Sequence, residues 1–139
     1  PGMRLDDYRV IPNFVAHAMQ KKPIPIYGSG KHTRTFCYVT DGITGFLKVL
    51  FSDLNGEAFN VGNDSNEISI ESLAKMVSEM LNDVKIKKTT GPIDAYASAD
   101  PKRRCPDITK LRARLNYEPR VDLKTGIKRF LDWVRESQQ

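Results

Sequence analysis

The spacing of apolar residues predicts four main helices. In four stretches, apolar positions recur three and four residues apart, which places them on one face of a helix. These stretches cover residues 11–21, about 40–51, about 69–81, and about 122 onward. The side chains expected to be buried are Phe14, Val15, Ala18 and Met19 in the first stretch, Ile43, Phe46, Leu47 and Leu50 in the second, Leu73, Met76, Val77 and Met80 in the third, and Ile127, Phe130, Leu131 and Val134 in the last.

Residues that favour helix starts precede these stretches, and they also predict a short helix over residues 107–115. The expected starts are Thr40 or Asp41 for the second helix, Ser69 for the third, Asp107 for the short helix, and Asp122 or Leu123 for the last. The short helix is expected to stop at the Asn116–Pro119 segment. Together with the four main helices, it makes five expected helices.

Runs of β-branched and aromatic residues between the helices predict short strands. They cover residues 24–27, 35–39, 58–62 and 84–90, and residues 91–106 have the composition of a loop. Pro25 lacks a backbone N–H group, which favours an edge position for the first strand. The pattern as a whole predicts one α/β or α+β domain over residues 1–139, made mostly of helices with short strands.

The composition is that of a globular protein with a single domain. Of the 139 residues, 40% are hydrophobic and 28% are charged. No apolar run reaches the ~18 residues of a membrane-spanning helix, and the first residues lack the apolar core of a signal peptide. The chain opens on Pro1-Gly2 without an initiator methionine, so we expect it to be cut from something longer.

Net charge and cysteine content exclude few classes of ligand or cellular compartment. The formal net charge is +5, which favours an anionic ligand without choosing between nucleic acid, a membrane surface and small phosphates. Cys37 and Cys105 lack the spacing of metal ligands. Unpaired cysteines fit a reducing compartment, so we expect a cytoplasmic protein.

Several apparent catalytic motifs fail on local chemistry. Tyr27 and Lys31 match Tyr-x-x-x-Lys, an acid/base pair that works when a helix places both residues on one face, but Gly28 and Gly30 oppose a helix there. No glycine-rich turn between a strand and a helix has the spacing that binds a dinucleotide. The histidines, at positions 17 and 32, are not at metal-binding spacing. The sequence therefore predicts no catalytic residue, no cofactor site and no metal site.

One pattern is specific. Residues 24–41, Ile-Pro-Ile-Tyr-Gly-Ser-Gly-Lys-His-Thr-Arg-Thr-Phe-Cys-Tyr-Val-Thr-Asp, closely resemble a segment of the extended short-chain dehydrogenases, in their nucleotide-sugar epimerase, dehydratase and decarboxylase branch. Other landmarks of that branch follow in order at Gly2-Met3-Arg4, Arg9–Phe14, Phe59–Gly62, Arg104–Ile108, Leu115–Pro119 and Leu123–Ile127. The resemblance covers essentially the whole chain and is greatest to UDP-glucuronate decarboxylases and related dehydratases.

The resemblance implies the C-terminal, sugar-nucleotide-binding portion of such an enzyme. In the family, NAD and the catalytic Tyr-x-x-x-Lys belong to an N-terminal Rossmann half, which this chain lacks. The full-length enzyme is expected to be a homodimer that acts on a UDP- or dTDP-sugar, whereas this chain alone is expected to be inactive and to bind no NAD. The resemblance also implies that the strand at 58–62 and its neighbouring helix pack on the Rossmann half, so their apolar faces would be exposed here.

The resemblance also nominates substrate-binding residues. Arg34 and Arg104 occupy the positions of diphosphate-binding arginines, and guanidinium groups suit that role because they bind phosphate through two parallel hydrogen bonds. The remaining candidates are Arg103, as the neighbouring rival of Arg104, Tyr27 with Pro25 against the base, Arg9 and Val10 as the opposite wall, and Asn63 more weakly, because polar residues at turns usually bond to the backbone. The family's usual glutamine is His32 here, and its usual glycine is Asn116.

Two other classes of function remain open. Lys102-Arg103-Arg104 and the positive net charge would suit a small nucleic-acid-binding module. The sequence lacks the interleaved aromatic residues, recognition-helix pattern or zinc spacing of such modules, so we expect no nucleic-acid partner. A non-catalytic protein-interaction domain is the third possibility, and the expected exposure of apolar faces favours it.

Overall fold

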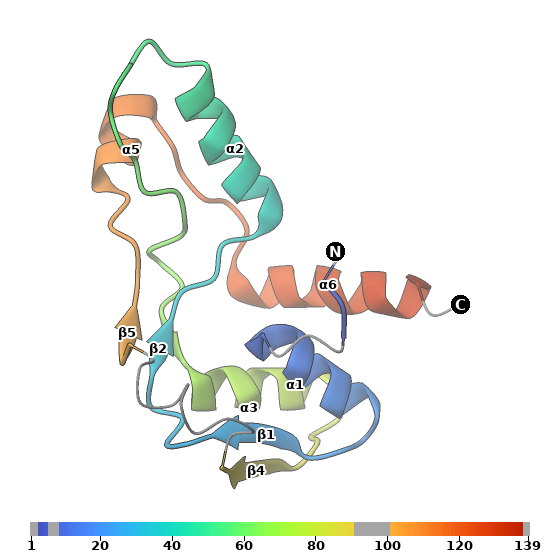
Figure 1. Cartoon of the computed structure of the whole chain (residues 1–139). Helices are drawn as coiled ribbons and strands as arrows, with labels where there is room; N and C mark the ends of the chain where they lie inside the picture. Colours follow the sequence, from blue (N-terminus) through green and yellow to red (C-terminus); the bar gives the residue numbers. More distant parts are fainter. Residues whose placement is uncertain (1–2, 6–8, 91–100, 138–139) are drawn as a thin grey trace.

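The computed structural model describes residues 3–5, 9–90 and 101–137, arranged as a larger lobe, a helical arm and a small sheet between them (Figure 1). The expected opening at Pro1-Gly2 and most of the expected loop at 91–106 lie outside the described residues. The fold is α/β and made mostly of helices with short strands, as predicted.

The larger lobe contains three helices and a pair of parallel strands. The helices are α1 (Val10–Met19), α3 (Ile70–Met80) and α6 (Leu123–Ser137), and strand β1 (Ile24–Tyr27) pairs with β4 (Ile86–Thr89) from Ile24↔Ile86 to Tyr27↔Thr89. Their core includes the predicted faces of all three helices, with Leu73 and Val77 fully buried and Met19, Met76 and Met80 partly buried. The Ser69 side chain accepts a hydrogen bond from the Ser72 backbone N–H, which confirms the predicted cap of α3.

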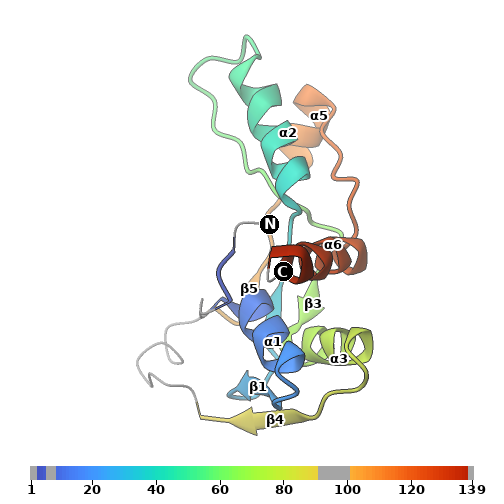
Figure 2. The same cartoon turned by 90° about the vertical axis from the view of Figure 1, so that its right-hand side faces the viewer.

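The arm consists of α2 (Val39–Leu50), α5 (Thr109–Leu115) and the loop that follows α2 in the sequence (Figures 1 and 2). Its small core contains Ile108, Leu111 and Tyr117, all fully buried. The Tyr117 hydroxyl donates to the Gly62 carbonyl at 2.9 Å. Asn116 ends α5 with φ 48°, as expected of a residue that tolerates the left-handed region.

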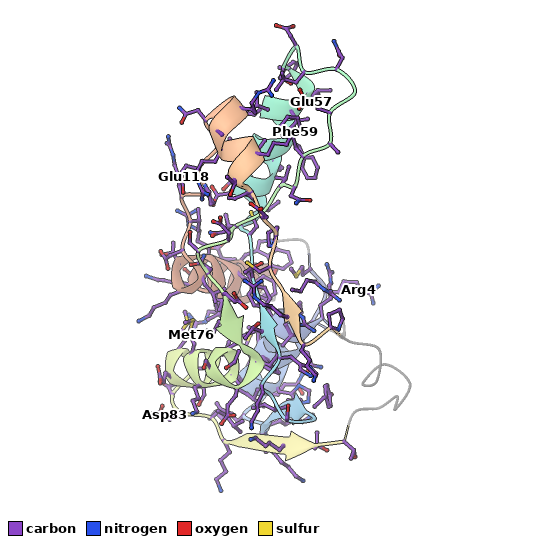
Figure 3. The ribbon with its side chains drawn as sticks, turned by 90° about the vertical axis from the view of Figure 1, so that its left-hand side faces the viewer. Arg4, Glu57, Phe59, Met76, Asp83 and Glu118 are labelled. Carbon is purple, nitrogen blue, oxygen red and sulfur yellow. The ribbon has the colours of Figure 1, made fainter. Side chains whose placement is uncertain are left out.

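The outer end of the arm is held by charged side chains. Glu57 and Phe59 lie together there (Figure 3). The Lys110 ammonium lies 3.1 Å from the Glu57 carboxylate and 4.6 Å from the centre of the Phe59 ring. Arg114 also reaches Glu57, at 3.4 Å. These contacts fasten the loop after α2 to α5.

A sheet of three very short strands joins the two parts. Strand β2 (Thr33–Arg34) lies between β3 (Ile68–Ser69), which is antiparallel to it, and β5 (Arg103–Arg104), which is parallel. β5 lies in the segment that was expected to be loop. The chain runs from β2 through residues 35–38 into α2, so this sheet connects the lobe to the arm.

Two predicted strands are wrong. Residues 35–38 form an extended lead into α2, whose N-cap is Tyr38 rather than Thr40 or Asp41. Residues 58–62 are not in a strand either, and Ala58 is exposed. In both places the β-rich composition is real, but the described residues offer no neighbouring strand that could complete a ladder there.

The predicted buried face of α2 is also wrong. Ile43, Phe46 and Leu50 are 52%, 67% and 70% exposed, and Leu47 is 45% exposed. The face that packs into the arm instead carries Asp41 and Gly45, both buried. The Asp41 carboxylate accepts hydrogen bonds from the backbone N–H groups of Arg120 and Val121, at 3.1 and 2.9 Å. Helical periodicity identified the apolar face of α2 correctly, but that face has no partner among the described residues.

The contact at Gly45 should be measurable against its neighbour Gly42. A Cβ atom at position 45 would collide with Val61 Cγ1 and come 3.0 Å from Tyr117 Cε2, whereas one at position 42 would meet nothing within 4 Å. Gly45→Ala should lower the free energy of unfolding by about 1–2 kcal/mol, because overpacking outweighs the gain in helix propensity. Gly42→Ala should raise it by about 0.5–1 kcal/mol. Equal effects of the two substitutions in urea unfolding would contradict the packing described for α2.

Candidate sugar-nucleotide site

Strand β1 ends in a glycine turn. Gly28 and Gly30 both have φ +71°, and a Cβ atom on Gly30 would lie 2.9 Å from Ile26 Cγ2. Any residue with a side chain is strained at these positions. Tyr27 and Lys31 are therefore separated by a turn rather than by one turn of a helix, so the Tyr-x-x-x-Lys match lacks the geometry of an acid/base pair.

The first backbone N–H groups of α3 hold the loop that follows this turn. The Ile70 N–H donates to the His32 carbonyl, and the Glu71 N–H donates to the Gly30 carbonyl, both at 3.0 Å. A helix N-terminus is a favourable place for a phosphate group because its N–H groups are unpaired. In α3 these two donors are occupied by protein carbonyls, and the loop is fixed in front of β2.

The register of the small sheet brings Arg34 and Arg104 together. They are directly paired residues of parallel strands β2 and β5, and so are Thr33 and Arg103. The Thr33 N–H donates to the Lys102 carbonyl at 2.9 Å, and the Thr35 N–H donates to the Arg104 carbonyl at 3.2 Å. Paired residues of neighbouring strands share one face of a sheet. Arg34 and Arg104 therefore project from the same face, and their two guanidinium groups could bind a diphosphate together.

Arg103 projects from the opposite face and forms an ion pair with Glu67. Its Nε lies 2.9 Å and 3.2 Å from the two Glu67 carboxylate oxygens, and its Nη2 lies 2.9 Å from the second. Thr33 donates its hydroxyl to the same carboxylate at 2.6 Å. Hydrogen bonds from Arg103 and then from Thr33 hold the pKa of Glu67 below its ordinary value. The structure thus separates the adjacent arginines, which the sequence could not do.

The other candidates lie in neighbouring elements. Arg9 is the N-cap residue of α1, and Val10 packs partly against the core of the larger lobe. Pro25 is buried within β1, against which α1 packs, and Tyr27 ends that strand with 41% of its surface exposed. An exposed aromatic ring at the end of a buried strand, next to a glycine turn, offers the flat apolar wall that a nucleobase needs.

Asn63 bonds to the backbone, as its place at a turn suggested. It is 3% exposed, and its Oδ1 accepts a hydrogen bond from the Ser65 N–H at 2.8 Å. This contact closes the turn that follows Gly62. The geometry gives Asn63 a role in shaping the chain beside the arm, and its role toward a ligand stays a prediction.

Besides the Glu57 contacts at the end of the arm, sequence reasoning missed two ion-pair networks near the candidate site. One is the pair of Glu67 with Arg103. In the other, Arg112 contacts Asp64 at 3.0 Å and Glu118 at 2.7 Å, and the Arg112 hydrogen bond is the main cause of the lowered pKa of Asp64. Glu67 and Arg103 are 36 residues apart in the sequence, and Asp64 and Arg112 are 48 apart. No local spacing could therefore have indicated these pairs.

The remaining polar groups of the described residues suggest no further chemistry. Among residues 3–5, 9–90 and 101–137, no three His, Cys, Asp or Glu side chains are grouped so that they could hold a metal ion. Burial raises the pKa of the Cys37 thiol, whose sulfur lies 3.7 Å from the Tyr117 hydroxyl. In the same part of the chain, no helix is both long enough and apolar enough to cross a bilayer.

Comparison with known proteins identifies relatives of the whole described region. The family described as GDP-mannose 4,6 dehydratase matches residues 4–130. UDP-glucuronic acid decarboxylase 1 of Arabidopsis thaliana is 38% identical over 135 residues, which make up 97% of this chain and 30% of that protein. The chain thus spans about a third of the length of this curated relative.

Solved structures of epimerases have the same fold. Epimerase Mth375 of Methanothermobacter thermautotrophicus matches with a TM-score of 0.83 and 30% identity, over 95% of this chain and 39% of that one. The UDP-glucuronic acid 4-epimerase of Bacillus cereus, solved with UDP-glucuronic acid and NAD, matches with a TM-score of 0.83 and 26% identity. That match covers 99% of this chain and 42% of the epimerase.

Proposed function

We propose, since the chain belongs to the GDP-mannose 4,6-dehydratase family, that it is the C-terminal, sugar-nucleotide-binding part of an NAD-dependent nucleotide-sugar epimerase, dehydratase or decarboxylase. The observation that carries the proposal is the pairing of Arg34 with Arg104 on one face of the small sheet. Further support comes from relatives whose names include UDP-glucuronic acid. The substrate is then a UDP- or dTDP-sugar, and the complete enzyme is a homodimer.

The role of this chain in that enzyme is to hold the substrate. Arg34 and Arg104 bind the diphosphate through charge-assisted hydrogen bonds, because a guanidinium group stays protonated and matches phosphate geometry. Tyr27 packs against the base, and Arg9 and Val10 form the opposite wall of that pocket. The cofactor-binding half of the enzyme carries out the oxidation of the sugar and the reaction steps that follow it.

The residues that the structure describes do not fit NAD itself. A dinucleotide pyrophosphate binds where a glycine-rich turn leads from a strand into the N-terminus of a helix. Here the turn at Gly28 and Gly30 leads into strand β2, and two N–H groups at the start of α3 bond to loop carbonyls. NAD would supply a hydride acceptor in the complete enzyme, and we assign no residue of this chain to it.

Calorimetric titration of this chain tests the proposal. UDP should bind weakly but saturably, because this chain supplies the two arginines and the base contacts but not the wall that would close the site. NAD should produce no saturable heat. A DNA duplex titrated at two salt concentrations serves as the control for a merely basic surface, since that kind of binding weakens steeply with salt. Saturable NAD binding, or binding of the DNA duplex that is tighter than binding of UDP, would contradict the proposal.

Arg34 should contribute most of the phosphate affinity together with Arg104. Arg34→Ala should raise the Kd for UDP by roughly ten-fold or more, since one bidentate charge-assisted contact is worth ~1.5–3 kcal/mol. Arg34→Lys keeps the charge but loses the two parallel hydrogen bonds of a guanidinium group, so its effect on the Kd should be intermediate. Arg135→Ala, which removes a cation of α6 paired with Asp132, is the matched control and should leave the Kd unchanged. An unchanged Kd for Arg34→Ala would remove this residue from the site.

The exposed apolar face of α2 is, in this proposal, where the cofactor-binding half packs. Val39, Ile43, Phe46, Leu47 and Leu50 follow helical spacing along it, and each is at least 45% exposed. Phe51, just after the helix, is 80% exposed. A contiguous row of exposed apolar side chains usually marks an interface. Support comes from the epimerase of Bacillus cereus, of which this chain matches 42%, so that most of the relative is available to cover the face.

Replacing Phe46 and Leu50 together by serine should test this assignment. We expect this chain to associate in a concentration-dependent way in sedimentation velocity. The double substitution should leave the melting temperature unchanged and reduce that association. Leu111→Ala, which opens a cavity in the core of the arm, should instead cost about 2–5 kcal/mol of stability. At the corresponding positions of a full-length relative, the serine substitutions should lower stability. A large loss of stability in this chain would mean that the face is part of its own core.

A further inference from the structure

We propose that Glu67 is a positioning residue that sets the register of β5 against β2 and thereby determines which of two adjacent arginines lies beside Arg34. The consequence for ligand binding rests on the proposed function, whereas the register itself does not. Glu67 lies just before β3, on the face opposite to Arg34 and Arg104, and it contacts residues of both other strands.

The register of β5 needs such a constraint because the strands are very short. β2 and β5 contribute two residues each, and two backbone hydrogen bonds between them flank the pair. Successive residues of a strand point to opposite faces, so a slip of one residue exchanges them. A slip that brought Lys102 opposite Thr33 would place Arg103, instead of Arg104, beside Arg34.

The contacts of Glu67 favour the observed register. Its carboxylate accepts from the Thr33 hydroxyl at 2.6 Å and from two nitrogens of Arg103, at 2.9 Å each. Thr33 and Arg103 are a directly paired couple, so one carboxylate spans the pair. In the slipped register Lys102 would face Glu67, and an ammonium group cannot form the planar fork that a guanidinium forms with a carboxylate. Glu67 therefore opposes the slip through a side chain that does not touch the ligand.

The third strand fixes Glu67 itself. Ile68 and Ser69 pair with Arg34 and Thr33, and α3 begins at the next residue. The side chain of Glu67 is 29% exposed, against 66% for Arg103. An exposed ion pair contributes little to stability in general, so we expect a local effect on β5 rather than a global one.

Amide hydrogen exchange tests the register without any ligand. In Glu67→Ala, the amides of Thr33 and Thr35 should exchange roughly ten-fold faster or more, because they donate to the Lys102 carbonyl just before β5 and to the Arg104 carbonyl within it. The amides of Ile24 and Gly28 donate to the carbonyls of Lys85 and Thr89 in the other sheet, and their exchange rates should not change. Unchanged exchange at Thr33 and Thr35, or equal acceleration at all four amides, would overturn the proposal.

Binding measurements then test the consequence for the arginines. Glu67→Ala and Arg103→Ala should each raise the Kd for UDP several-fold, and the double variant should do little more than either, because all three remove the contact between Glu67 and Arg103. The affinity for uridine, which has no phosphates, should stay the same in NMR titrations, whereas general unfolding would weaken both ligands. The charge-exchanged pair Glu67→Arg with Arg103→Glu should recover UDP binding relative to either single change.

The outcomes separate the two proposals. Additive losses, with no recovery in the charge-exchanged pair, would mean that Arg103 contacts the phosphates directly and would overturn the role of Glu67. If the unsubstituted chain binds no UDP while Thr33 and Thr35 still lose protection in Glu67→Ala, the proposed function fails and the register role stands. If UDP binds but exchange at Thr33 and Thr35 does not respond, the register role fails and the proposed function stands.

Discussion

Two hydrogen bonds at the start of α3 constrain everything that the site can do. The N–H groups of Ile70 and Glu71 bond to the carbonyls of His32 and Gly30, which fixes the loop after β1 in front of the small sheet. The same bonds occupy donors that could otherwise have bound a phosphate. In the proposed site, recognition of an anion therefore falls to side chains, so the arrangement of the arginines on β2 and β5 decides whether they can act together.

How far the sequence predicted the structure depended on which segments complete their own packing. The buried faces of α1, α3 and α6 were predicted correctly because these helices cover one another. The apolar face of α2 was identified but its burial was not, since periodicity says which side of a helix is apolar and nothing about what covers it. For the same reason the β-rich segment at 58–62 was predicted as a strand although no described neighbour pairs with it.

The candidate site was predicted as a set of positions and not as an arrangement. The resemblance to a known family pointed to Arg34, Arg104 and Tyr27, but local sequence could not separate Arg103 from Arg104. Only the register of a ladder that joins residues about 70 positions apart assigns them to opposite faces. Glu67 gave no signal at all, because the importance of a carboxylate that binds a distant arginine is visible only once the strands are aligned.

The chain runs back and forth between the two parts of the molecule, and this has a consequence for its synthesis. The larger lobe takes α1 and β1 from the beginning, α3 and β4 from the middle, and α6 from the end, while the arm is built from the segments between them. Ile127, Phe130, Leu131 and Val134 of α6 complete the core of the larger lobe. Pairings between such distant segments form slowly. Residues up to α6 must therefore have left the ribosome before the core of the larger lobe can close, so a shorter nascent chain would expose core surface to chaperones and proteases.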